Sequence, residues 1–107
     1  MEFDHYQGLA RLTAIYPERT EEEALAYLAL GLAGEVGEVA QLIKRQQRDG
    51  QAVNHAQMAA ELGDVLWYIS EAARQIGVSL EEVAQMNLRK LDDRRQRGAL
   101  GGSGDKR

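Results

Sequence analysis

Four helix-start signals, spread along the 107-residue chain, constrain its fold more than any other feature of the sequence. In each signal a short polar residue stands three positions before Glu or Gln, so that the two side chains can satisfy the first free backbone amides of a helix. The four pairs are Asp4…Gln7, Thr20…Glu23, Asn54…Gln57 and Ser79…Glu82. No segment shows the apolar and polar alternation of a strand. The sequence therefore predicts an all-α chain.

Helix-stop signals follow each start and set the expected helix lengths. The Tyr16-Pro17 step blocks continuation of the first helix, and Gly50, Gly77 and Gly98 can each take the left-handed conformation that ends a helix. We therefore expect four helices, near residues 4–16, 20–48, 55–76 and 80–97.

The second and third expected helices each carry one apolar stripe at three- and four-residue steps, which favours packing as an antiparallel helix hairpin. The stripes consist of Leu25, Leu28, Leu32, Val36, Val39 and Ile43 on one helix, and of Met58, Leu62, Val65, Leu66, Ile69, Ala73 and Ile76 on the other. Trp67 and Tyr68 lie away from the stripe, on a side that a lone hairpin leaves wet. We expect a second subunit, a bound base or the fourth helix to cover them.

The length of the chain bears on its domain organisation. We find no internal repeat and no interdomain linker, so residues 1–100 are predicted to form a single helical domain. Residues 101–107 are rich in glycine and are predicted to form a flexible tail. A monomer of this size buries only about two-thirds of its surface, so we expect oligomerisation to complete the bundle.

The composition excludes several functions. The absence of cysteine removes disulfides, thiolate metal sites and cysteine nucleophiles. A net charge of −4 argues against general binding of nucleic acid, which needs surplus lysine and arginine. No uninterrupted apolar run is long enough to span a membrane, and the chain begins Met1-Glu2-Phe3-Asp4 without a signal segment. We expect a cytoplasmic protein with no membrane partner.

Two acid pairs of one form lie on the second and third expected helices. They are Glu35/Glu38 and Glu61/Asp64, each with an apolar residue and a glycine between the two acids. Residues three apart on a helix project from the same side, so each pair offers two carboxylates to one ion. Counted back from the short loop expected around Gly50, which joins the two helices, the pairs differ in height by about four residues, or roughly 6 Å, which side-chain length can absorb.

Converging carboxylates at a helix interface require a neutralising cation or protons. Magnesium, with manganese as a possible substitute, suits an all-oxygen ligand set that also bridges to phosphates. Zinc is disfavoured because neither His5 nor His55 belongs to a pair, and a di-iron site would need Glu-x-x-His on two helices. The alternative is that the acids belong to a solvated helix face, as single pairs of this spacing usually do.

Gly31, Gly34 and Gly37 fall inside the second expected helix. Each costs a helix about 1 kcal/mol relative to alanine. Their presence therefore predicts the close approach of another helix or a ligand.

The acid pairs and their surroundings resemble the MazG-like all-α nucleoside triphosphate pyrophosphohydrolases. The resemblance runs through residues 32–39, which read LAGEVGEV, and residues 61–68, which read ELGDVLWY. It resumes at residues 87–91, which read NLRKL, with Arg94 beyond, and residues 97–107 resemble the tail of small stand-alone members.

The resemblance implies an enzyme that hydrolyses the bond between the α- and β-phosphates of a nucleoside triphosphate, giving a monophosphate and pyrophosphate. It also implies magnesium held by all four acids, and a homodimer or homotetramer. Many members carry one more acid before the first glutamate, where this chain has Gly34. The role of that acid would fall to Glu35, Glu38 or Glu71, and we favour Glu38 as the base while any of the four acids could serve.

Basic residues of the fourth expected helix complement the acids. Lys90 and Arg94 share a helix face, with Asn87 one turn before, so they could hold phosphate, sugar or base. Lys44 and Arg45, close to the end of the second expected helix, are weaker candidates for the same substrate-binding role. The alternative is that these charges form a solvated end that suits the helix C-terminus.

Aromatic and tail residues complete the predicted substrate site. Trp67 and Tyr68 could stack on a nucleobase, and their alternative role is subunit packing. Tyr68 lies one turn beyond Asp64 on the same face, which favours it near substrate. Asp105 and Arg107 are candidates for a tail that closes over the phosphates.

Two rival hypotheses stay open. Phosphoribosyl-ATP pyrophosphohydrolase of histidine synthesis resembles the same family and uses similar acid motifs. A non-catalytic helical interaction module, whose acid pairs only stabilise an assembly, belongs to another class and predicts neither a metal requirement nor turnover.

Overall fold

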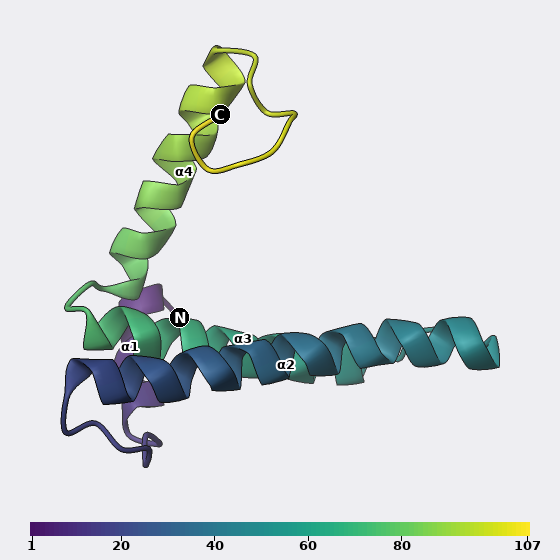
Figure 1. Ribbon diagram of the computed structural model, residues 1–107, viewed down its shortest axis with the longest axis horizontal. Helices are drawn as coiled ribbons and strands as arrows, with labels where there is room; N and C mark the ends of the chain where they lie inside the picture. The colour runs from purple at the N-terminus through teal and green to yellow at the C-terminus, as the bar shows by residue number, and fades with distance from the viewer.

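The computed structural model describes residues 1–107 and contains four α-helices and no strands, so the all-α prediction is confirmed. The helices are α1 (Phe3–Arg11), α2 (Glu21–Asp49), α3 (His55–Gln75) and α4 (Leu80–Gln96). Helices α2 and α3 lie side by side, and α1 crosses them near one end (Figure 1).

Three of the four predicted caps form as expected. The side chains of Thr20, Asn54 and Ser79 accept hydrogen bonds from the backbone amides three residues on, at 3.0–3.1 Å. Each satisfies one of the amides that a helix start leaves free. The predicted stops also form, because Gly50, Gly77 and Gly98 have φ angles of 70°, 75° and 68°, in the left-handed region.

The first helix begins within one residue of the predicted start, but its predicted C-terminal end is wrong. Helix α1 ends at Arg11 rather than near residue 16, and Thr13 Oγ1 donates a hydrogen bond to the carbonyl of Ala10 where the chain turns. The early end lets Tyr16 leave the helix and pack against Ala24 and Leu28, where only 6% of it stays exposed. Burial of this large ring outweighs the extra helical turn.

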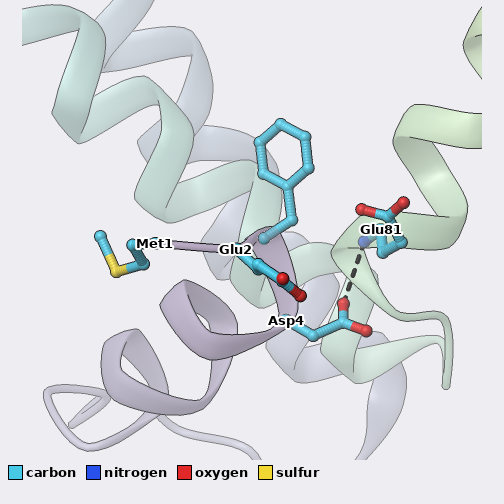
Figure 2. Close-up of a pocket in the computed structure, with 5 residues that line it drawn as sticks. Met1, Glu2, Asp4 and Glu81 are labelled. Carbon is cyan, nitrogen blue, oxygen red and sulfur yellow. Dashed lines mark hydrogen bonds between the residues drawn. The ribbon is translucent and has the colours of Figure 1, made fainter.

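The Asp4 and Gln7 side chains do not cap α1, which has no side-chain cap. Asp4 Oδ1 instead accepts a hydrogen bond from the amide of Glu81 at 3.0 Å, as Figure 2 shows. Gln7 Oε1 accepts one from the amide of Leu80 at 3.1 Å. The first helix therefore accepts hydrogen bonds from two further free amides at the start of α4, beside the Ser79 cap.

The face on which α3 meets α2 differs from the predicted stripe. Leu28 and Ala73 of the stripes are buried, but others are more than one-third exposed, namely Val36, Ile43, Leu62 and Ile76. Trp67, Tyr68 and Ala72 pack against the core formed by Tyr16, Ala24 and Leu28. The aromatic side of α3 therefore faces α2 and both rings are half-buried, so the expectation that a lone hairpin leaves Trp67 and Tyr68 wet is wrong.

One buried acid anchors this core. Glu71 is 0% exposed; it accepts a hydrogen bond from the Tyr16 hydroxyl at 2.7 Å and is paired with Arg74 at 2.7 Å. Arg74 also reaches Glu18 at 3.2 Å. The network joins α3 to the segment between α1 and α2, so Glu71 holds the fold together here.

Helix α4 contacts only α1 and α3, and it projects away from the α2–α3 pair (Figure 1). Consequently the radius of gyration is 16.5 Å, against about 13 Å for a compact chain of this length. Large apolar side chains stay exposed along α4, among them Met86, Leu88 and Leu91. The single chain thus leaves much apolar surface uncovered.

Helix α2 is long and apolar enough, by length and composition, to cross a membrane. Core helices of soluble proteins share these properties, and Glu35 and Glu38 lie within α2, where a charge at the centre of a bilayer costs about 2.5–3.5 kcal/mol. Only 6% of the most apolar part of this helix is buried. Its uncovered side is therefore suited to contact with other helices.

Candidate metal and nucleotide site

Three of the four predicted acids come together between α2 and α3. Glu35 of α2 and Glu61 and Asp64 of α3 each offer a carboxylate oxygen, and these atoms lie within 4.8 Å of one another. Glu35 and Glu61 are half-buried, and Asp64 is exposed. We call these three residues the acid cluster.

The chain provides no positive charge to neutralise the acid cluster. No lysine, arginine or histidine forms an ion pair with any of its three members. Partial burial raises the pKa of Glu35, and the neighbouring charges of Asp64 and Glu61 raise it further. Three convergent oxygen donors without a counter-ion fit a hard divalent cation such as magnesium.

Glu38 is not part of the acid cluster. It is exposed on α2, about one turn beyond Glu35, and its charge contributes to the raised pKa of Glu35. Its predicted roles as metal ligand and general base therefore stay predictions.

A pocket of about 310 Å³ opens beside the acid cluster. Thr13, Glu35, Asp64, Trp67 and Tyr68 line it, so the two predicted aromatic residues lie next to two of the acids. Trp67 Nε1 donates a hydrogen bond to Thr13 Oγ1 at 2.8 Å, which fixes the indole ring. The pocket combines carboxylates with aromatic surface, as a site for a metal-bound nucleotide requires.

Tyr68 packs directly over the backbone of α2 at Gly31. A Cβ atom at residue 31 would lie 2.1 Å from Tyr68 Cε1, so only glycine fits there. Burial raises the pKa of Tyr68, and nearby Tyr27, Glu35 and Asp64 add to the shift. The close approach predicted for the glycines is confirmed at Gly31.

At two other glycines of α2 no helix of the same chain approaches, and the approach of a ligand or of another subunit's helix stays a prediction. Nothing lies within 4 Å of a Cβ atom built at Gly34 or Gly37. Both glycines lie on the side of α2 that the chain leaves open, so no close packing explains them here.

Two residues differ from the sequence-based picture of the site. Thr13 belongs to the pocket but was hidden from sequence reasoning, because residue 13 was expected inside a continuous first helix. Glu71, one candidate for the missing extra acid, is buried against Tyr16 and Arg74 and does not line the pocket. The Tyr16-Pro17 step predicted a helix end near residue 16 and did not indicate the earlier end at Arg11 that brings Thr13 into the turn.

The predicted basic residues do not reach the acid cluster within one chain. Helix α4 does not contact α2, and none of its residues lines the pocket. Lys90 and Arg94 instead bind the tail at Asp105, and Arg107 donates hydrogen bonds to the carbonyls of Gly104 and Leu100.

The two remaining candidates, Asn87 and Lys44, are also outside the pocket. Asn87 is exposed on α4, and Lys44 is exposed on α2 two turns beyond Glu35 and Glu38. Neither makes a side-chain hydrogen bond or an ion pair, so both could contact another molecule. Their substrate-binding roles stay predictions.

Comparison with known proteins adds family information. A family model described as the MazG nucleotide pyrophosphohydrolase domain matches residues 20–98, which contain both acid pairs, Trp67, Tyr68 and the basic residues of α4. The Gene 37 protein of Mycobacterium phage L5 is 45% identical over 114 aligned residues, which cover 100% of both chains. No solved structure shows significant similarity to this chain.

Proposed function

The chain belongs to the MazG nucleotide pyrophosphohydrolase domain family, and we propose that it hydrolyses a nucleoside triphosphate to a monophosphate and pyrophosphate with the help of magnesium. One observation carries this proposal. The acid cluster has no counter-ion of its own and opens onto a pocket lined by Trp67 and Tyr68. A cation and a nucleotide together supply what this arrangement lacks.

Glu35, Glu61 and Asp64 would hold the cation, with manganese as a possible substitute for magnesium. When bound, the ion supplies positive charge to the phosphate oxygens and lowers the pKa of water. The three carboxylates fix its place on two packed helices. Their partial burial strengthens their attraction for a cation.

Glu38 would accept the proton from the attacking water. It lies close to Glu35 but outside the group that would hold the cation, so its oxygens are free for a proton. The water oxygen forms a bond to the α-phosphorus, and the bond from that phosphorus to the bridging oxygen breaks. Pyrophosphate leaves with the bonding electrons, and the proton of water passes to Glu38.

Trp67 and Tyr68 would bind the nucleobase. The hydrogen bond from Trp67 to Thr13 and the packing of Tyr68 over Gly31 hold both rings before substrate arrives. Stacking of a base on an aromatic ring contributes on the order of 1–3 kcal/mol. Rigid rings lose little further freedom on binding.

The site would be completed by a second subunit in a homodimer or homotetramer built on an antiparallel α2–α3 hairpin. Three observations support this part of the proposal: α4 projects from the body, its apolar residues are exposed, and the pocket lacks basic residues from its own chain. Asn87, Lys90 and Arg94 of one subunit would then serve the acid cluster of another. Lys44 could assist from α2.

Mixing two inactive variants tests this sharing of sites. Asp64→Asn removes a carboxylate of the acid cluster and Lys90→Gln removes a cation of α4, and each alone should abolish most turnover. If the two residues act in one site from different subunits, random mixed dimers regain about a quarter of wild-type activity. No recovery after subunit exchange would mean that both residues act from the same chain or in different steps.

The biological role would be the removal of unwanted nucleotides from the cytoplasmic pool. The alternative within the family is phosphoribosyl-ATP pyrophosphohydrolase, which the same acid cluster would serve.

A substrate panel tests the proposed reaction. The purified protein is incubated with ribo-, deoxy- and modified nucleoside triphosphates and with phosphoribosyl-ATP, in magnesium, manganese or chelator, and the phosphate products are separated by ion exchange. Glu38→Ala and Asp64→Ala are compared with Glu22→Ala, which removes an exposed acid of the same helix pair far from the pocket. The expected products are monophosphate and pyrophosphate, formed only with metal and only by wild type and Glu22→Ala.

Other outcomes redirect the proposal. Cleavage of phosphoribosyl-ATP alone would keep the site and change the pathway. Absence of any turnover, with all variants folded, would favour an interaction module.

A further inference from the structure

The C-terminal tail, residues 101–107, folds back along α4 (Figure 1). One carboxylate oxygen of Asp105 lies 2.6 Å from Lys90 Nζ and 3.1 Å from Arg94 Nη2. Arg94 Nη2 also donates to the main-chain oxygen of Asp105. The tail thus gives two oxygen acceptors to two cations that lie one turn apart.

This contact organises the cations more than it buries the acid. The Arg94 side chain is 6% exposed, whereas the Asp105 side chain is 75% exposed. Lys90, followed by Arg94, holds the pKa of Asp105 below its usual range. Asp105 is therefore a charged ligand of an ordered pair of cations, and solvent can reach it.

The chemistry of the contact resembles the binding of phosphate. Lysine and arginine bind carboxylate and phosphate oxygens through the same charge-assisted hydrogen bonds. A polyphosphate brings more oxygens and more negative charge than one carboxylate, so it would bind the same two cations more strongly.

We propose that Asp105 is a tethered competitor, which occupies Lys90 and Arg94 in the free protein and must leave before these residues bind a polyphosphate. The identification of the anion as the polyphosphate of a nucleotide rests on the proposed function. The tail then acts as an intramolecular brake on substrate binding.

The sequence of the tail suits such an exchange. Gly102 and Gly104 adopt φ angles of 85° and 88°, which residues with side chains rarely take, so these glycines let the chain return to α4. Displacement of Asp105 restores to the glycines the freedom that the contact removes. Because the competitor is attached, its effect appears as a reduced apparent affinity for polyphosphate rather than as a fixed block.

Binding of inorganic tripolyphosphate in metal-free buffer, measured by titration calorimetry on the full chain, tests the brake. Asp105→Asn removes the competing charge, and its dissociation constant should be about three- to tenfold lower than that of wild type. Asp92→Asn is the matched control, because it removes one acid of α4 that is paired with Arg95. Its affinity should stay within about twofold of wild type.

A second measurement follows the tail itself. On addition of tripolyphosphate, the backbone amide signals of Gly102 and Gly104 in the NMR spectrum should sharpen and move toward random-coil positions, as the tail is released. Lys90→Gln should bind tripolyphosphate less tightly than wild type.

Three results would overturn the inference: an unchanged or weaker affinity of Asp105→Asn, no binding by either protein, or tail signals that become more protected when tripolyphosphate binds. The last would mean that the tail closes over the phosphates. These measurements need no turnover, so they test the brake separately from the proposed function. If the protein hydrolyses no nucleotide but Asp105→Asn binds tripolyphosphate more tightly than wild type, the proposed function is wrong and the brake is supported.

Discussion

Helix α3 carries two sets of acids, and the chain treats them in opposite ways. Glu71 is fully buried, yet it receives a hydrogen bond from Tyr16 and two from Arg74. Two to three turns earlier, Glu61 and Asp64 meet Glu35 of α2 with no cation among them. The more buried acid is the one that the chain neutralises.

The protonation of the two regions reflects this difference. Burial acts to raise the pKa of Glu71, but the hydrogen bonds of Arg74 and Tyr16 outweigh it and lower the pKa. At Glu35 burial and the charges of Asp64 and Glu61 act together, so the pKa is raised. An acid with its own partner stabilises the fold, whereas acids that only repel one another are suited to an external cation.

Removal of Arg74 should produce the largest effect on stability. Arg74→Met leaves Glu71 buried with no cation, and breaking a buried ion pair from one side costs about 3–5 kcal/mol. Chemical denaturation followed by circular dichroism measures the loss. Arg19→Met, which breaks the exposed pair with Glu23, should leave stability nearly unchanged.

A double variant separates the ion pair from simple loss of packing. If unpaired charge causes the damage, Glu71→Gln combined with Arg74→Met should recover much of the stability lost in Arg74→Met. A double variant no more stable than the single one would show that Arg74 acts through its other contacts, with Tyr16 and Glu18.

In the acid cluster, a substitution should lower activity without lowering stability. Glu61→Gln keeps the shape of the side chain but weakens a predicted metal ligand, so we expect turnover to fall at least about 100-fold. Its unfolding midpoint without metal should be equal to wild type or higher, because one repelling charge is gone. A large loss of stability would place Glu61 with Glu71 as a structural acid.

Much of the fold follows from local sequence signals. The caps at Thr20, Asn54 and Ser79, with the glycine stops, set the bounds of three helices to within one or two residues. The remaining signal, Asp4…Gln7, gave a wrong prediction, because these two side chains cap α4 and not the helix that contains them. A cap motif specifies which side chains can bind free amides, but tertiary packing decides which helix provides them.

The site was predictable in part for a similar reason. The repeated acid pairs predicted four converging acids, because helical spacing fixes which side chains share a face. Three of them meet, namely Glu35, Glu61 and Asp64, and spacing alone did not separate these from Glu38. Helical spacing alone placed Leu62 in the interface and Tyr68 outside it, whereas Leu62 is exposed and Tyr68 packs on α2. The contact at Gly31 decides that interface, and it depends on the distance between two helices, which no single-helix pattern contains.

The glycines of α2 give a smaller test of the same interface. Gly31→Ala places a Cβ atom against Tyr68, and overpacking of this kind costs about 1–3 kcal/mol, partly offset by about 1 kcal/mol of helix propensity. We expect lower stability and lower turnover, because Tyr68 must move. Gly34→Ala meets nothing within 4 Å and should raise stability by up to about 1 kcal/mol. Equal behaviour of the two variants would contradict the packing of Tyr68 on α2.

The smallest expected effect is the change in stability caused by Glu35→Gln, and its sign depends on whether magnesium is present. In metal-free buffer near neutral pH, Glu35→Gln should stabilise the protein by a few tenths of a kcal/mol, because it removes repulsion within the acid cluster. Since the folded-state pKa of Glu35 is raised, the penalty it imposes appears as pH rises through that value. The advantage of Glu35→Gln should therefore vanish below the ordinary glutamate pKa.

Magnesium should invert the order of the two proteins. Wild type gains stability from the bound ion in proportion to its affinity, whereas Glu35→Gln has lost a ligand and gains less. Thermal unfolding at several pH values, with and without magnesium, measures both effects. Wild type that is more stable than Glu35→Gln even without metal would mean that the chain neutralises Glu35 itself, as it does Glu71. The contrast between the two regions of α3 would then be lost.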